Sequence, residues 1–312
     1  MSIIQTISAK ERFALARGRR QRQLEKLYAP AFYKIIRKQL RDYLKVIDEQ
    51  GYPYAKANLF TLIDPTAMAE TIKGLYRQAA FVEGNAVANS LRRKEPQLKY
   101  VAGGGGMGIT LDALAPVIDD YFRIFLLEKA ALPISQTTRE YITKHLITEV
   151  DGGKPLDEAV KDFTQLALTG TGKSSYAENR ARNIARTEST KALSFGGLIG
   201  AYMSGKDVER VWVTSADERV RVKPFSHVHL DGNVTDMFQP FQNGEAINFP
   251  GDPTASKANV INCRCCVYFR EKQKPKPRIV RTLTTFLSDF FAGFNLGISL
   301  TDDFLNALNP FD

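Results

Sequence analysis

The sequence predicts an α+β fold, in which a mainly helical N-terminal half precedes a C-terminal domain of one long helix and a small antiparallel sheet. Two observations predict this division. Apolar residues recur at intervals of three and four from residue 9 to about residue 203, which is the period of an amphipathic helix. At residues 208–214 the pattern alternates as it does in a strand, and shorter segments follow. A chain of 312 residues is long enough for two domains.

The composition is that of an ordinary core-forming protein, with 44% hydrophobic and 25% charged residues. No stretch reaches the ~18 uninterrupted apolar residues that a membrane helix needs, so we expect no membrane span. The apolar run from Met1 to Ile7 is too short for a signal peptide and charge follows at once, so we expect no signal peptide either. The three cysteines, Cys263, Cys265 and Cys266, crowd into four positions. This spacing does not suit a secreted disulfide framework and favours a reducing cytoplasm.

Residues 1–100 are predicted to form a basic helical arm. The stretch 9–47 carries one apolar stripe, and Pro30 is expected to divide it into two helices, because proline favours the first turn of a helix. A further helix is expected from Asp64 to Ser90. Residues 1–45 hold twelve Lys and Arg against three Asp and Glu, a net +9 that equals the formal net charge of the whole chain. The excess positive charge therefore belongs to this arm.

Two explanations of this charge remain open. The side chains form a solvated helix face, or they contact an acidic surface, either nucleic acid or an anionic protein. Because no base-reading motif accompanies the charge, contacts with nucleic acid would be made to phosphates and would weaken with salt. The candidate contact residues are Arg17, Arg19, Arg20, Arg22, Arg37 and Lys38.

Residues 109–170 are predicted to be a helical connecting region, which a glycine-rich linker at residues 103–106 separates from the arm. Within it the expected helices are residues 112–127, residues 135–150 with Ser135 as the N-cap, and residues 156–168.

Residues 175–270 are predicted to be the C-terminal domain. Ser174 or Ser175 is expected to cap its long helix, Tyr176–Met203, and the sheet is expected to close with a strand at residues 260–269. Residues 271–312 follow as a Pro- and Lys-rich linker and a Phe-rich tail, which we expect to dock on a partner or on its own domain.

The stretch 212–265 concentrates the side chains that bind metals. Thiolate and imidazole are the preferred ligands of zinc, and four of them complete a tetrahedral site. In an extended strand, residues two apart share a face. His227 can therefore act together with His229, and Cys263 with Cys265, while Cys266 points away. The alternative is buried cysteines and hydrogen-bonded histidines without metal. The candidate ligands of a structural Zn²⁺ are His227, His229, Cys263 and Cys265.

Catalytic templates fit this stretch poorly. The HEXXH motif is absent, as is the His-x-Glu and Cys-x-x-Cys pair of zinc deaminases. A Cys–His nucleophile pair lacks a third, orienting group that spacing alone can identify. The sequence therefore predicts no enzyme. Two alternatives remain: a metal-dependent, nuclease-like enzyme that uses His227 and Cys263, and a non-specific DNA-binding module.

An ordered set of residues resembles the phage Mu F-like minor head protein domain, also called the phage head morphogenesis domain. The resemblance covers residues 175–270, and the order of the set makes it specific although each piece alone is weak. The residues that carry it are Arg186, Glu188, Trp212, Asp217, Arg221, His227, Asp231, Gly232, Pro250, Asp252, Asn262, Cys263 and Cys265.

This resemblance implies a minor head (capsid) protein of a tailed bacteriophage or prophage. Such a protein would bind the portal and act in head morphogenesis or in genome packaging and delivery. Its expected location is the virion, in the capsid interior at the portal vertex, after assembly in the host cytoplasm. The basic arm would face the portal or the capsid interior and could contact packaged DNA through phosphates. The resemblance implies no enzymatic activity.

Overall fold

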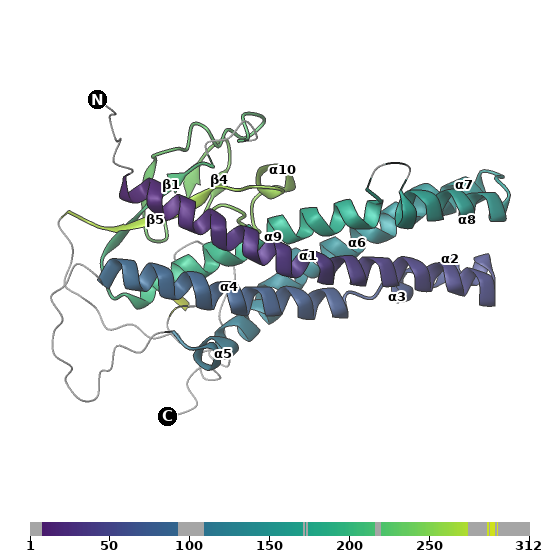
Figure 1. Cartoon of the computed structure of the whole chain (residues 1–312), viewed down its shortest axis with the longest axis horizontal. Helices are drawn as coiled ribbons and strands as arrows, with labels where there is room; N and C mark the ends of the chain where they lie inside the picture. Colours follow the sequence, from purple (N-terminus) through teal and green to yellow (C-terminus); the bar gives the residue numbers. More distant parts are fainter. Residues whose placement is uncertain are drawn as a thin grey trace. The chain divides into compact units, whose positions relative to one another are not determined.

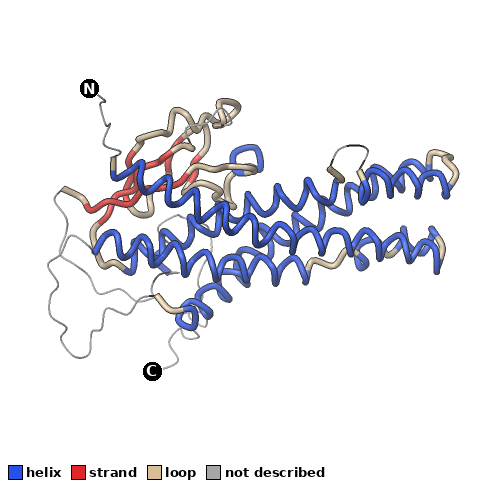
Figure 2. Tube along the Cα trace, in the orientation of Figure 1, coloured by secondary structure: helices blue, strands red, loops and turns tan. Residues whose placement is uncertain are grey.

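A computed structural model describes residues 8–92, 109–170, 172, 174–215, 220–273, 286, 288–290 and 292. It is mainly helical, and its strands all follow residue 203 (Figures 1 and 2). The predicted α+β class, with a helical N-terminal half and a small antiparallel sheet in the C-terminal part, is confirmed. The glycine-rich linker and most of residues 271–312 lie outside the described residues.

Within residues 8–92 and within residues 109–170, helices follow one another almost without interruption. Wide helical segments labelled η join some of the α-helices. Their bounds are α1 Ala9–Gln50, α2 Tyr52–Ala57, α3 Leu59–Leu62, α4 Thr66–Arg92, α5 Leu111–Tyr121, η1 Phe122–Ala131, α6 Leu132–Ile142, η2 Thr143–Ile147, α7 Thr148–Asp151, α8 Leu156–Thr164, η3 Gln165–Thr169 and α9 Tyr176–Met203.

The chain forms two compact units, each made of several separate segments. Unit 1 contains the described parts of Met1–Gln23, Leu75–Tyr121 and Thr187–Asp312, and unit 2 contains Leu24–Gly74 and Phe122–Arg186. Three of the four boundaries fall inside α1, α4 and α9, so each of these helices contributes to both units, and the fourth lies between α5 and η1. Periodicity carries no information about which distant segments pack together. The domains predicted from the sequence therefore simply follow one another along the chain.

The sheet lies in unit 1 and has the order β2-β1-β5, with both pairings antiparallel. Strand β1, Val208–Val213, occupies the centre and is almost wholly buried. Strand β5, Cys266–Glu271, begins later than predicted, because residues 257–260 form the short helix α10 (Lys257–Val260) and Asn262 has a φ of 60°. The remaining strands are β2 Val234–Asp236 and a separate pair, β3 Phe241–Gln242 with β4 Ala246–Ile247.

Two predicted helix boundaries are wrong. Pro30 lies inside α1 and does not split it. Its ring sits on the exposed side of the helix, where water can satisfy the carbonyl that loses its partner, and the buried side chains of Phe32 and Ile36 hold the helix together. Ser135 is not an N-cap but is buried within α6, since the chain is helical from residue 111 to residue 151. Buried apolar residues on both sides carry the helix through that position.

The start of α9 agrees with the prediction. Ser175 forms a capping box with Glu178, because the Glu178 backbone N–H donates to Ser175 Oγ at 3.3 Å and the Ser175 N–H donates to Glu178 Oε2 at 3.2 Å. The helix then spans Tyr176–Met203, as expected.

The core of unit 1 centres on aromatic rings from α5, α9 and the C-terminal tail. Tyr121 and Phe195 stack with their centroids 4.0 Å apart, and Phe286 and Phe290 meet Phe195 edge-on at 5.6 Å. The hydroxyl of Tyr202 donates to Asp289 at 2.5 Å. The described part of the Phe-rich tail therefore packs on its own unit. Phe291 and Phe294 of the same tail lie outside the described residues.

Within unit 1, helices α4 and α9 approach so closely that only glycine fits between them. A Cβ at Gly200 would lie 2.2 Å from the carbonyl oxygen of Gly84, and one at Gly196 would lie 2.7 Å from Ala80 Cα. We expect Gly200→Ala to lower the free energy of unfolding by about 3 kcal/mol, at the upper end of overpacking penalties. Urea denaturation measures this. Gly18→Ala is the control, because its Cβ would meet its nearest neighbour at 3.5 Å. Equal stability of the two variants would contradict the close approach.

Unit 2 is held together by contacts between its own helices. The guanidinium of Arg139 donates to the carbonyl of Ile63 at 2.8 Å and to that of Phe60 at 3.2 Å, which fixes the end of α3. Tyr141 and Tyr176 stack with their ring centroids 3.5 Å apart.

Among the described helices of either unit, none combines the length and apolar composition that a membrane span requires.

Candidate metal centre

Three side chains converge in unit 1 on one buried point. Cys263 Sγ and Cys265 Sγ each lie 3.5 Å from His227 Nδ1, and the ligand atoms of the three residues all lie within 4.8 Å of one another. The exposed fractions of His227, Cys263 and Cys265 are 1%, 4% and 2%. All three donors therefore face one another in a space screened from water.

These distances fit a zinc ion. With Zn–S of about 2.3 Å and Zn–N of about 2.0–2.1 Å, the edge between N and S in a tetrahedral site is about 3.5 Å. The chemistry of the donors fits as well, because two thiolates and an imidazole suit Zn²⁺ better than they suit Mg²⁺ or Ca²⁺. Three protein ligands leave one position of the tetrahedron for water or another donor.

Two loops position these residues. His227 begins a turn in which the Leu230 N–H donates to the His227 carbonyl at 3.2 Å, and Gly232, with a φ of 80°, lets the chain reverse into β2. Cys263 and Cys265 lie between α10 and β5. The Thr190 hydroxyl of α9 donates to the Cys263 carbonyl at 2.6 Å and so ties this loop to the helix.

The predicted geometry of the ligands needs two corrections. The sequence placed each pair on a strand, whereas His227 lies in a turn and Cys263 and Cys265 lie in a loop. His229 is not part of the converging group. Its side chain is exposed, because the turn that begins at His227 breaks the alternation on which the pairing depended. Cys266, the first residue of β5, also stands outside the group, as expected.

Asn259, which sequence reasoning missed, orients the imidazole. Its Oδ1 lies 2.6 Å from His227 Nε2. The orientation of the Asn259 amide is fixed because its Nδ2 donates to Glu245 Oε1 at 2.6 Å, and an ionised carboxylate can only accept. In the neutral imidazole Nε2 therefore carries the proton and Nδ1 keeps its lone pair, which is the arrangement that fixes a metal-binding histidine. Trp212 covers the ring edge-on at 5.3 Å.

The electrostatics of the group favour one thiolate even without a metal. The hydrogen bond from Cys265, with further help from His227, holds the pKa of Cys263 well below that of an ordinary thiol, although burial opposes this. The same hydrogen bond and burial raise the pKa of Cys265. Burial lowers the pKa of His227, but its hydrogen bonds to Cys263 and Asn259 outweigh burial and raise it. Burial raises the pKa of Cys266 to about 12, so this thiol stays protonated.

Cys263, His227 and Asn259 also stand in the order of a nucleophile, a base and an orienting amide. A nucleophile must be reached by its substrate, however, and the three residues have exposed fractions of at most 4%. Their burial leaves little of these side chains open to a substrate.

The loops of this centre lie within a region that is similar to a known protein family. Residues 140–268 match the family model described as Phage Mu protein F like protein. The chain carries a phage Mu F-like domain. The match includes α9, the metal-centre loops and the sheet up to the middle of β5, and it covers less than half of the chain. Searches of curated proteins and of solved structures gave no match.

Several of the residues that carry the resemblance frame the loops of the Mu F-like domain. The Arg221 guanidinium donates to the carbonyls of Asn259 and Ile261, the latter at 2.8 Å, and so holds α10 beside the metal centre. The Asn262 N–H donates to Thr187 Oγ1 at 3.0 Å. Asp231 Oδ1 accepts from the Thr214 N–H at 2.8 Å and ends β1.

Other residues of the Mu F-like pattern are buried in polar contacts. Asp252 accepts from the backbone N–H groups of Asn248 and Thr254 at 2.8 and 2.9 Å, while burial raises its pKa. Glu188 pairs with Lys191 at 2.7 Å inside unit 1. The Pro250 carbonyl accepts a hydrogen bond from Ser194 Oγ. Arg186 pairs with Glu25 within unit 2. Asp217 lies outside the described residues.

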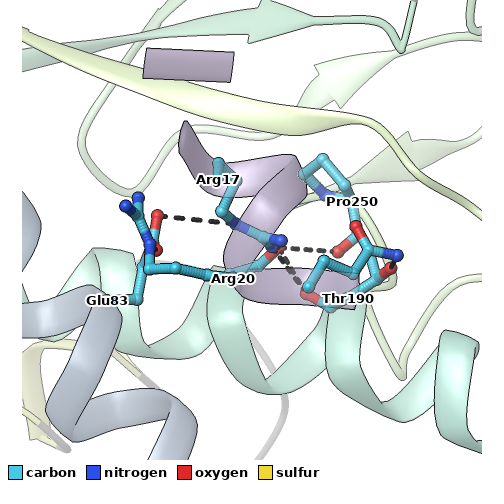
Figure 3. Close-up of polar contacts among 7 residues, drawn as sticks. Arg17, Arg20, Glu83, Thr190 and Pro250 are labelled. Atoms are coloured by element: carbon cyan, nitrogen blue, oxygen red, sulfur yellow. Dashed lines mark hydrogen bonds and ion pairs between the residues drawn. The ribbon is translucent and has the colours of Figure 1, made fainter. Parts of the chain in front are cut away.

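The basic arm is used differently from the prediction. Arg17 is buried with an exposed fraction of 3%, and its Nε lies 3.4 Å from Glu83 Oε1 (Figure 3). Arg20 Nε lies 2.5 Å from Glu83 Oε2, and Arg17 also donates to the Thr190 carbonyl at 3.1 Å. Arg17 and Arg20 are thus bound inside unit 1 and are not free to contact a partner. This network attaches the start of α1 to the Mu F-like domain.

The other candidate contact residues lie nearer the surface of α1. Arg19, Arg22 and Lys38 are exposed, and Arg37 is partly buried over the ring of Tyr33 at 5.6 Å. A partner-binding face of the arm must therefore be sought among the exposed residues of α1.

Proposed function

We propose that this chain is a minor head protein of a tailed phage or prophage, located in the capsid interior at the portal vertex. It binds the portal protein and acts in head morphogenesis or in genome packaging and delivery. The observation that carries the proposal is the phage Mu F-like match over residues 140–268, which supports a head-morphogenesis protein and a virion location.

The role proposed for the cysteine and histidine cluster is structural. Zn²⁺ held by His227, Cys263 and Cys265 would bind two separate loops of the Mu F-like domain to each other. The support is the 3.5 Å spacing of the donors, their burial and the orienting hydrogen bond of Asn259. The alternative of a metal-dependent enzyme gains less support, because these side chains are screened from substrates.

Portal binding is tested by co-expressing the full chain with the portal protein of the same phage and purifying through a tag on the chain. We expect the portal protein to co-elute, and a tagged major capsid protein serves as the control bait. Recovery of the chain without the portal protein would overturn the portal assignment. Incorporation of the chain into heads is measured separately.

A further inference from the structure

We propose that the exposed face of α1 between Lys26 and Lys45 binds the phosphate backbone of duplex DNA. This surface, here called the cation ladder, consists of Lys26, Lys34, Lys38, Arg41 and Lys45, all within unit 2. It takes the place of the buried Arg17 and the half-buried, ion-paired Arg20 as the nucleic-acid surface of the arm. The inference deepens the proposed function, on which it rests for its biological setting, by naming a partner and the residues that bind it.

The ladder lies on one side of the helix. Lys34, Lys38, Arg41 and Lys45 follow one another at spacings of four, three and four residues, and Lys26 continues the row through Pro30. Side chains at these spacings stand one above another on a helix surface. From Lys26 to Lys45 the row advances by nineteen residue steps, or about 29 Å at 1.5 Å per residue. One strand of B-DNA presents a phosphate roughly every 3.4 Å, so its charges are dense enough to meet each cation.

The charge of the ladder is little compensated. Asp42 is the one carboxylate residue between residues 26 and 45, and it pairs with Lys38. Lys45 pairs with Glu49 at 3.5 Å. The Lys38 and Lys45 side chains are 77% and 68% exposed, so these ion pairs contribute little and are easily exchanged for phosphate. Lys26, Lys34 and Arg41 have no ion pair with any described residue.

The composition of this face favours a polyanion over a protein partner. Seven side chains are exposed between residues 26 and 45, and five of them are the ladder cations. The other two are Leu27 and Pro30. The centres of protein–protein interfaces are instead depleted in lysine and enriched in aromatic residues. Phosphate contacts need no such apolar centre, because counterion release supplies most of the affinity.

The test is fluorescence anisotropy of the full chain with a labelled mixed-sequence duplex, across a series of salt concentrations. We expect log Kobs to fall with log salt at a slope of about −4, as for four or five neutralised phosphates. The triple variant K26A/K34A/R41A should reduce the magnitude of that slope by about 2.7, or about 0.9 for each phosphate that the variant no longer neutralises. Alanine is a good helix former, so the variant should keep its fold, which circular dichroism checks.

The matched control is K129A/K144A/K161A, which removes the same three charges from exposed positions elsewhere in unit 2. It should bind DNA with the wild-type slope. Equal slopes for the two triple variants, or wild-type binding to polyglutamate in preference to the duplex, would overturn the proposal. Head incorporation of K26A/K34A/R41A is scored separately, so loss of DNA binding with normal incorporation leaves the proposed function standing.

Discussion

Cys263→Ala is expected to lower the zinc content of the purified chain from one ion per molecule to none. The substitution removes one of three protein ligands, and the remaining Cys265 and His227 cannot hold the metal tightly. Because zinc binds the folded state in preference to the unfolded chain, its loss should also cost about 4 kcal/mol of stability at a zinc concentration a thousand times Kd. Elemental analysis and thermal unfolding with and without a chelator measure the two effects.

Two control variants separate the metal centre from general damage. Cys266→Ala removes a buried thiol next in sequence but outside the converging group, and His229→Ala removes an exposed imidazole two residues from His227. Both should retain one zinc per chain. A wild-type protein free of zinc, or a Cys266→Ala variant as depleted as Cys263→Ala, would show that these side chains do not form a metal site.

Glu83→Gln is expected to lower the free energy of unfolding by about 3–5 kcal/mol, the usual cost of leaving a buried charge without its partner. Glu83 has an exposed fraction of 1% and binds both Arg17 and Arg20. Burial lowers the pKa of Arg17, and the negative charge of the Glu83 carboxylate opposes that shift. The carboxylate therefore stabilises the charged form of the buried guanidinium. Urea denaturation, monitored by circular dichroism, gives the change.

The control for Glu83 is Asp42→Asn, which breaks the exposed pair with Lys38 and should cost about 0–1 kcal/mol. The double variant R17M/E83L tests the cause, because an apolar replacement of a buried ion pair recovers much of the stability lost when only one partner is removed. A Glu83→Gln variant as stable as Asp42→Asn would contradict the proposed role of this ion pair.

The sequence predicted the elements whose signal is local. Helix α9 has the predicted bounds and the predicted serine cap, because a long amphipathic period and a capping box both depend on residues that are close together in sequence. The first half of α1 shows the limit of periodicity. Arg17 and Gln21 continue the spacing of the buried Leu24 toward the N-terminus, so the position of Arg17 was predictable as buried although its charge suggested a surface.

Three of the four candidate ligands named from the sequence converge, without His229, and their geometry differs from the prediction. His227, Cys263 and Cys265 meet, yet they do so from a turn and a loop, because Asn262 in the left-handed region delays the start of β5. Asn259, Glu245 and Glu83 could not be identified, since their partners lie 32, 14 and 63 residues away in sequence and their residue types are common on surfaces. Only the folded chain brings these side chains together.

The most direct test of the account is quantitative mass spectrometry of purified heads of the phage or prophage that encodes this chain, before and after DNA packaging. We predict that the chain co-purifies with both forms, in far fewer copies than the major capsid protein, and that it resists added protease until the heads are opened. Absence of the chain from purified heads, or complete digestion by protease while the heads are intact, would contradict its assignment as an internal head protein.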